Sequence, residues 1–230
     1  NSGAIETVLG HRNSESFKGI NDLVFDRDGN CYFTDQGQTG MHNPTGCVYR
    51  LQTNGKLDQL LANAPSPNGI ALDTSGRFLF VAVTRGNAVW RGPLLPDGSI
   101  SKVGVFRSFF GTSGPDGMAV DATGRLVVAH ASLGCAFVLN PRGEVTHVVR
   151  SPTGQTVTNV AFRPGTNEPL HLGQVNTPLT EAEWRDGFDA MNRGDTLRNF
   201  HVALIDADGR RLRKLRTGRL MVLRLVTPAR

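Results

Sequence analysis

The chain has 230 residues, of which 39% are hydrophobic and 20% charged, a balance typical of one or two globular domains and not of a disordered protein. No uninterrupted apolar run approaches the ~20 residues that a transmembrane helix needs, so we expect no membrane partner. The 27 glycines and 12 prolines exceed ordinary usage and indicate many tight turns between short strands. Because Cys31, Cys47 and Cys135 form no CxxC pair, we expect buried thiols instead of a disulfide or a zinc-thiolate site.

The formal net charge of +5 is concentrated at one end of the sequence. Residues 198–230 hold eight arginines and Lys214 against only Asp206 and Asp208. Clustered arginines can neutralise nucleic-acid phosphates, but Phe200 is the one aromatic residue of this segment that could stack on bases. We therefore expect no nucleic-acid partner and interpret 198–230 as a basic, divergent end of the chain.

A repeat runs through the sequence. Its units begin at Asn21, Asn68, Asp116 and, more loosely, Asn159, at intervals of 47, 48 and 43 residues. Each of the first three has a polar anchor, an apolar run, an Asp-x-x-Gly turn and a second β-rich run, followed by a further strand and hairpin. Four strands in about 45 residues are typical of a propeller blade. The sequence therefore predicts an all-β protein, a β-propeller with about five blades' worth of chain in a single domain over residues 1–230.

One stretch departs from the repeat. Residues 176–194 contain a capping box at Thr180 and Glu183 and a glycine stop at Gly194. Trp184 and Met191 fall on one helical face together with Phe188. This pattern predicts a short helical insertion near 180–193 that packs its apolar face on the propeller, with a partner-binding helix as the alternative.

The polar anchors are the candidate functional residues. Asn21, Asn68 and Asp116 hold the same position in successive repeats, and oxygen donors from separate blades suit a hard divalent cation such as calcium or magnesium. The alternative is that these residues only cap turns before strands. Around Asn68 and Asp116 the preceding proline and the following glycine recur as well, which turn capping alone does not require.

At these residues the chain resembles the gluconolactonase, regucalcin (senescence-marker) and related lactonase family of six-bladed propellers. The resemblance covers residues 16–162 and rests on NDLVFDRDGNCYFTD, PTGCVYRL, PNGIALDTSGRFLFVA, and PDGMAVDATGRLVVA followed by TNVAF. It implies a divalent cation, calcium first and zinc, magnesium or manganese as alternatives, held by Asn68, Asp116 and a first-blade glutamate. It also implies that Asn21 contacts substrate or completes the metal shell, and that Asp116 is the catalytic general base or proton shuttle.

Two features depart from the family pattern. The family glutamate lies in a Glu-Gly-Pro motif well before the NDL segment, whereas Glu6 and Glu15 stand in no such motif, so we expect the first blade to be missing from this sequence. After Phe162, the predicted helical insertion and the arginine-rich end replace compact strands. Without the glutamate, we expect weaker cation binding, and the unpaired blade edges could support oligomer formation.

The reaction implied by the resemblance is the metal-dependent hydrolysis of a cyclic ester, with a small-molecule lactone as substrate. The cation would polarise the lactone carbonyl, while Asp116 takes a proton from the attacking water. Asp35, at the end of a strand, would contact substrate hydroxyls. The alternative interpretation of Asp35 is a solvated carboxylate at the strand end. His130 either lines the channel or packs as an ordinary core histidine. A non-catalytic propeller that binds a small ligand or a protein partner stays as the alternative function.

Overall fold

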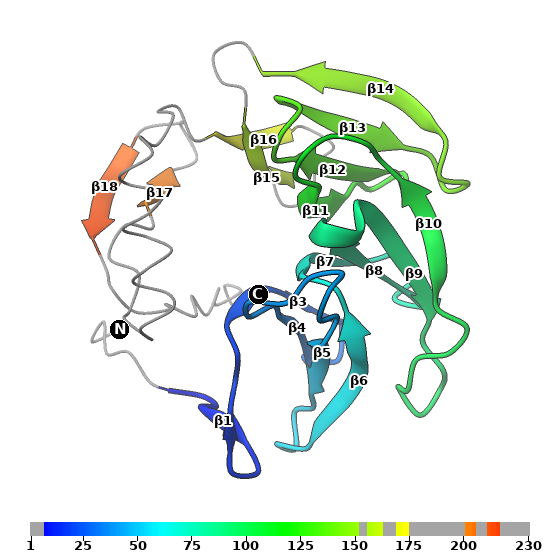
Figure 1. Ribbon diagram of the computed structural model, residues 1–230, viewed down its shortest axis with the longest axis vertical. Helices are drawn as coiled ribbons and strands as arrows, with labels where there is room; N and C mark the ends of the chain where they lie inside the picture. Colours follow the sequence, from blue (N-terminus) through cyan, green and yellow to red (C-terminus); the bar gives the residue numbers. More distant parts are fainter. Residues whose placement is uncertain (1–6, 152–155, 163–168, 175–200, 206–210, 217–230) are drawn as a thin grey trace, which may run out of the picture. The chain divides into compact units, whose positions relative to one another are not determined.

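The computed structural model describes residues 7–151, 156–162, 169–174, 201–205 and 211–216. The chain forms two compact units, Leu9–Thr177 and a second made of Asn1–Val8 and Pro178–Arg230. Three four-stranded antiparallel sheets, each in chain order, dominate the described part of the first unit (Figure 1). They are β3 to β6 (Ile20–Phe25, Cys31–Asp35, Gly46–Leu51, Leu57–Ala64), β7 to β10 (Pro67–Leu72, Phe78–Val83, Ala88–Pro93, Gly104–Ser108) and β11 to β14 (Pro115–Val120, Leu126–His130, Cys135–Leu139, Val145–Arg150).

The described part also contains shorter elements. A hairpin of β1 (His11–Arg12) and β2 (Glu15–Ser16) precedes the first sheet, and a 3₁₀ turn, η1 (Thr84–Gly86), joins β8 to β9. After the third sheet, β15 (Val157–Phe162) pairs with β16 (Pro169–Gln174). In the second unit, β17 (His201–Ile205) pairs with β18 (Arg211–Arg216).

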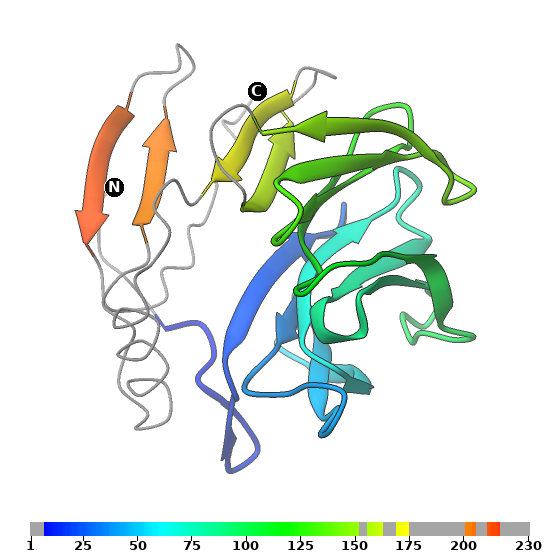
Figure 2. The ribbon, with the colours of Figure 1, turned by 45° about the horizontal axis from the view of Figure 1, so that its top comes forward.

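Each sheet is one blade, and the blades correspond to the sequence repeat. The first strands of the blades, β3, β7 and β11, lie next to one another, and β15 continues the series beside β11. Figures 1 and 2 show these inner strands side by side, with the outer strands fanning away from them. The predicted all-β blade architecture is thus confirmed. The predicted helix near 180–193 lies outside the described residues.

The Asp-x-x-Gly turns join the first and second strands of each blade as predicted. In the second blade, Gly76 has a φ of 71°, where a side chain would be strained, and its N–H donates to the carbonyl oxygen of Asp73 at 2.9 Å. The Asp73 carboxylate accepts hydrogen bonds from the N–H groups of Arg77 and Phe78 at 2.7 and 2.8 Å. These bonds are local to the turn, and the first blade adds one contact, from the Arg27 guanidinium to the carbonyl oxygen of Thr74 at 2.9 Å.

The core lies between the blades. Alternating side chains of one blade pack against those of the next, and burial of their apolar surface is the main force that holds neighbouring blades together. The buried residues group into clusters between the first and second blades (Tyr32, Val48, Ile70, Leu79, Val81, Val83), between the second and third (Phe80, Val89, Met118, Val128, Phe137), and between the third blade and β15 (Ala129, Ala136, Val157, Val160). All three cysteines are free thiols; Cys47 and Cys135 are buried, as expected, whereas Cys31 is half-buried. Within the described residues, no helix has the length and hydropathy to cross a membrane.

Candidate active site

The three predicted anchor residues occupy the same irregular position in their blades. In each blade, the pairing of the first strand with the second breaks immediately after the first pair and resumes three residues later. The breaks run from Ile20 to Leu23, from Pro67 to Ile70 and from Pro115 to Met118. Each break contains the anchor and the residue after it. Such bulge-like breaks re-aim side chains and are over-represented next to active sites.

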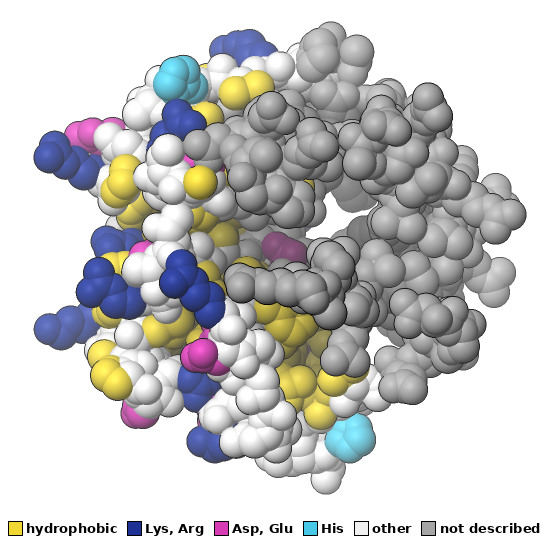
Figure 3. All heavy atoms as spheres, turned by 180° about the vertical axis from the view of Figure 1, so that it is seen from behind, with side chains coloured by type: hydrophobic (Ala, Val, Ile, Leu, Met, Phe, Trp, Pro, Cys, Tyr) yellow, Lys and Arg dark blue, Asp and Glu magenta, His cyan; other side chains and the backbone are white. Residues whose placement is uncertain are grey.

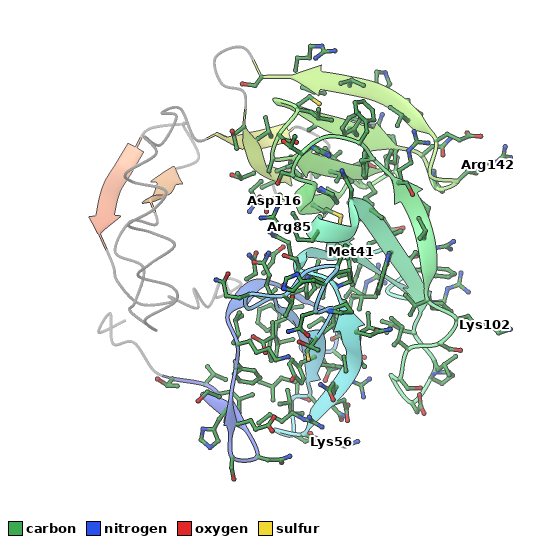
Figure 4. All side chains as sticks on the ribbon, viewed as in Figure 1. Met41, Lys56, Arg85, Lys102, Asp116 and Arg142 are labelled. Carbon is green, nitrogen blue, oxygen red and sulfur yellow. The ribbon has the colours of Figure 1, made fainter. Side chains whose placement is uncertain are left out.

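The structure brings Asn68 and Asp116 into contact. Asn68 is buried at the start of β7, and its side-chain amide lies close enough to the Asp116 carboxylate at the start of β11 to lower the pKa of that carboxylate. The Gly117 N–H acts on the carboxylate in the same direction. Figure 4 shows Asp116 at the inner side of the blades, whereas Lys56, Lys102 and Arg142 project from the outer edge. Two of the three predicted ligands therefore meet at the inner strands.

A second carboxylate, which the sequence analysis did not single out, belongs to this site. Asp22 follows Asn21 in β3, and its two oxygens accept hydrogen bonds from the N–H groups of Leu23 (2.8 Å) and, in the next blade, Ile70 (3.1 Å). Burial raises the pKa of Asp22. Burial, and after it the negative charge of Asp22, raise the pKa of Asp116 to about 7 against the lowering effects of the Gly117 N–H and the Asn68 amide. Two desolvated carboxylates thus interact across the first three blades.

Glycine follows the anchor in the second and third blades because the inner strands approach closely there. A Cβ atom on Gly69 would lie 2.2 Å from the carbonyl oxygen of Asp116, and one on Gly117 would lie 2.1 Å from Oδ1 of Asn159. Both distances are far below any real van der Waals contact. The glycines therefore permit each anchor to lie directly against the strand of the next blade.

Asn21 is the most exposed of the three anchors, and a glutamine holds it. Its Nδ2 donates to Oε1 of Gln36, 2.8 Å away, and Nε2 of Gln36 donates to Oγ of Ser66 at 2.7 Å. Ser66 stands two residues before Asn68. A chain of side-chain hydrogen bonds thus joins the anchor of the first blade to the segment that carries the anchor of the second.

Two other residues considered from the sequence are buried. Asp35 is only 2% exposed, so the solvated alternative is wrong, and its Oδ1 accepts a hydrogen bond from the Gly19 N–H at 2.7 Å. Its contact with substrate stays a prediction. His130 is fully buried, with its ring against Phe109 and Phe137, and it is a packed core histidine. Burial lowers its pKa to about 4.

The residues that sequence reasoning missed carry different signals. Asp22 stands where the second and third repeats have Gly69 and Gly117, and an acidic residue at a position that is otherwise glycine could have marked it. Gln36 lies in a connection without repeat pattern, so nothing in the sequence pointed to it. Asn159 was noted as a fourth anchor, and the structure places it against Gly117.

The donor set suits a hard cation. Amide and carboxylate oxygens are the ligands that calcium and magnesium take in proteins. Among the described residues, no Lys, Arg or His forms an ion pair with Asp22 or Asp116, so their charge has no cationic partner there. The same part of the chain has no group of three or more His, Cys, Asp and Glu arranged for a metal. Glu15 is exposed on the β1–β2 hairpin, and Glu6 lies outside the described residues.

Two hollows lie away from the inner strands. One of about 210 Å³ lies over the outer strands of the second blade, and its lining includes Arg91 and Phe106. The other, of about 260 Å³, lies between β6 of the first blade and the outer strands of the second, and its lining includes Trp90. The Arg91 guanidinium stacks 3.6 Å over the Phe78 ring, which accounts for its position. Figure 3 shows Lys and Arg side chains spread over the described part of the face that it draws.

The sequence matches known proteins. The sequence model of the family described as SMP-30/Gluconolactonase/LRE-like region matches residues 1–171. The lactonase drp35 of Staphylococcus haemolyticus is 33% identical over 175 residues, which are 72% of this chain and 53% of that protein. This chain therefore spans about half the length of the curated relatives it matches.

Solved structures agree with this assignment. A putative gluconolactonase superposes with a TM-score of 0.60 at 28% identity, over 70% of this chain and 57% of that one. Regucalcin from Agrobacterium tumefaciens, described as a calcium-binding protein, superposes with a TM-score of 0.55 at 25% identity, over 62% and 48% of the two chains. The chain is a β-propeller protein and belongs to the SMP-30/gluconolactonase/LRE-like family.

Proposed function

We propose that this chain carries the catalytic centre of a divalent-cation-dependent lactonase, which hydrolyses a small-molecule cyclic ester. The observation that carries the proposal is the placement of Asp116, a desolvated carboxylate that contacts Asn68 and is influenced by Asp22. The relatives are named as lactonases and gluconolactonases, and one neighbour is described as calcium-binding. Both the chemistry of the site and the names of the relatives thus favour the same reaction class.

Asn21, Asn68 and Asp116 would hold the cation, with calcium the expected ion. When bound, the cation supplies electrophilic polarisation of the ester carbonyl and charge stabilisation of the oxyanion that develops. Asp22 adds negative charge next to this set, which favours a divalent cation. A bound cation would lower the pKa of Asp116, against the effects of burial and of Asp22.

Asp116 would act as the general base. Its carboxylate takes a proton from water while the water oxygen attacks the carbonyl carbon of the lactone; the bond between this carbon and the ring oxygen then breaks. The proton ends on the released alkoxide, so one water is consumed and one hydroxy acid is formed. Burial and the charge of Asp22 both raise the pKa of this carboxylate, which makes it a better base than a solvated aspartate. Asn21 would orient hydroxyl groups of the substrate.

The test is lactone hydrolysis by the chain after treatment with a chelator and restoration with calcium, magnesium, manganese or zinc. A panel of sugar, aromatic and homoserine lactones covers the substrate classes, and acid release is followed by pH-stat titration. We expect no turnover with chelator and recovery with at least one cation. Cation binding without hydrolysis of any lactone would overturn the proposal and favour the non-catalytic, ligand-binding propeller.

A further inference from the structure

Gln36 lies between two of the anchors and bonds to both of their segments. It directly follows β4, and its backbone N–H donates to the carbonyl oxygen of Gly19, 2.9 Å away. Its side chain accepts from Nδ2 of Asn21 and donates to Oγ of Ser66. One primary amide therefore connects the anchor of β3 to the connection that enters β7.

The residues around Gln36 hold it rigidly. Ser66 is buried and has a φ of 62°, a left-handed conformation that is uncommon for a residue with a side chain. Its N–H donates to Oγ1 of Thr39 at 3.0 Å, and its carbonyl oxygen accepts from the Thr84 N–H at 3.0 Å. The Thr39 hydroxyl in turn donates to the carbonyl oxygen of Gln36 at 2.7 Å. Main chain and side chain of Gln36 are thus tied to one small network.

This network has a consequence for the Asn21 amide. An amide group presents two donors on nitrogen and an acceptor on oxygen, and a cation binds only the oxygen. Because Nδ2 of Asn21 is bonded to Oε1 of Gln36, Oδ1 is the atom left for a cation or for a substrate hydroxyl. Without Gln36, the exposed side chain could rotate and present either atom.

We propose that Gln36 is a positioning residue: it orients the Asn21 amide with its oxygen toward the cation or substrate and couples Asn21 to the Ser66–Asn68 segment. The identity of the ligand rests on the proposed function. The orientation of the Asn21 amide is a property of the free protein and does not depend on that function. Partners that orient metal ligands typically contribute 10–100-fold to metal affinity.

The first test is calcium binding by titration calorimetry in three variants. Gln36→Leu removes both side-chain hydrogen bonds, and we expect calcium affinity to fall about 10-fold. Gln36→Glu still accepts from Asn21 Nδ2 and can accept from the Ser66 hydroxyl, so affinity should be retained or increase. Gln59→Leu is the matched control, because the Gln59 amide in the same blade donates to the Cys47 thiol and the Tyr49 hydroxyl, away from the anchors; its affinity should equal that of the unmodified chain.

The second test needs no cation. In the free chain, the side-chain NH₂ signal of Asn21, assigned by its disappearance in Asn21→Ala, should show restricted motion in ¹⁵N relaxation measurements. Gln36→Leu should make this signal mobile, and Gln36→Glu should restore its rigidity, while the thermal unfolding midpoints of all variants stay close together. Equal mobility of Asn21 with and without Gln36 would overturn the proposal. A rigid Asn21 in a chain that binds no divalent cation would support the positioning role and reject the proposed function.

Discussion

The Asn68 side-chain amide lies close enough to Asp116 of the next blade to lower the pKa of the Asp116 carboxylate. The anchors of two repeats thus meet where the inner strands approach closely: a Cβ atom on Gly69 would lie 2.2 Å from the Asp116 carbonyl oxygen. Asp22 adds a second negative charge from the first blade. The site thus combines the anchors of the second and third blades with the residue that follows the anchor of the first, and each of them can be tested separately.

Asp116→Asn should abolish lactone turnover without unfolding the chain. The amide can still coordinate a cation through its oxygen, but it cannot accept a proton at neutral pH. General-base assistance typically contributes about 10²–10⁴-fold, so kcat should fall by that order. The measurement is initial hydrolysis rate at saturating cation, with Asp97→Asn, an exposed aspartate of the β9–β10 hairpin, as the control. Turnover by Asp116→Asn at the unmodified rate would reject its role as general base.

Asp22→Asn should shift the pH dependence of hydrolysis. The charge of Asp22 raises the pKa of Asp116, so its removal lets Asp116 lose its proton at lower pH. Because the base acts when deprotonated, the acid limb of the kcat/KM profile should move to lower pH, by up to about one unit. Asparagine can still accept from the Ile70 N–H, which preserves the contact between blades. The control Asp28→Asn, at an exposed turn position, should leave the limb in place; a shift to higher pH in Asp22→Asn would contradict the argument.

The blades could be predicted from sequence because their determinants are local. The turn at Asp73 and Gly76 is fixed by hydrogen bonds within five residues, and the alternating runs on either side specify which face is buried. The position of Asn68 and Asp116 at the start of inner strands followed from the same repeat. Their meeting required only that neighbouring inner strands be adjacent.

The remaining parts of the site depend on contacts between distant segments. Asp22 acquires its role from the N–H of Ile70 in the next blade, and sequence spacing does not show this bond. Gln36 meets Asn21 and Ser66 through an irregular connection with no period to align. His130 occupies a strand end that could equally have faced the inner strands, and only the packing of Phe109 and Phe137 shows that it is buried.

His130 should make the blades sensitive to acid. Burial lowers its pKa from 6.5 to about 4, so the folded chain binds this proton less readily than the unfolded chain. The neutral, buried His130 therefore favours the folded chain above pH 6.5, and this contribution is lost as the pH falls toward 4. The loss in the free energy of unfolding is at most about 3 kcal/mol. Urea unfolding between pH 7 and pH 4 measures this loss. In His130→Gln, which can still hydrogen-bond Asn87, the free energy of unfolding should fall less over this pH range. An equal fall in both proteins would show that other groups cause it.

Gly69→Ala should damage both stability and the site, whereas Gly104→Ala should damage neither. A Cβ on Gly69 would lie 2.2 Å from the Asp116 carbonyl oxygen, while one on Gly104 would have no atom within 4 Å. Relief of the first clash requires β7 and β11 to separate, at a cost of about 1–3 kcal/mol or more. The separation also moves Asn68 away from Asp116, so calcium affinity should fall together with the urea midpoint. Both quantities are measured on the same samples, and retention of calcium affinity in Gly69→Ala would show that close approach of these strands is not needed for the site.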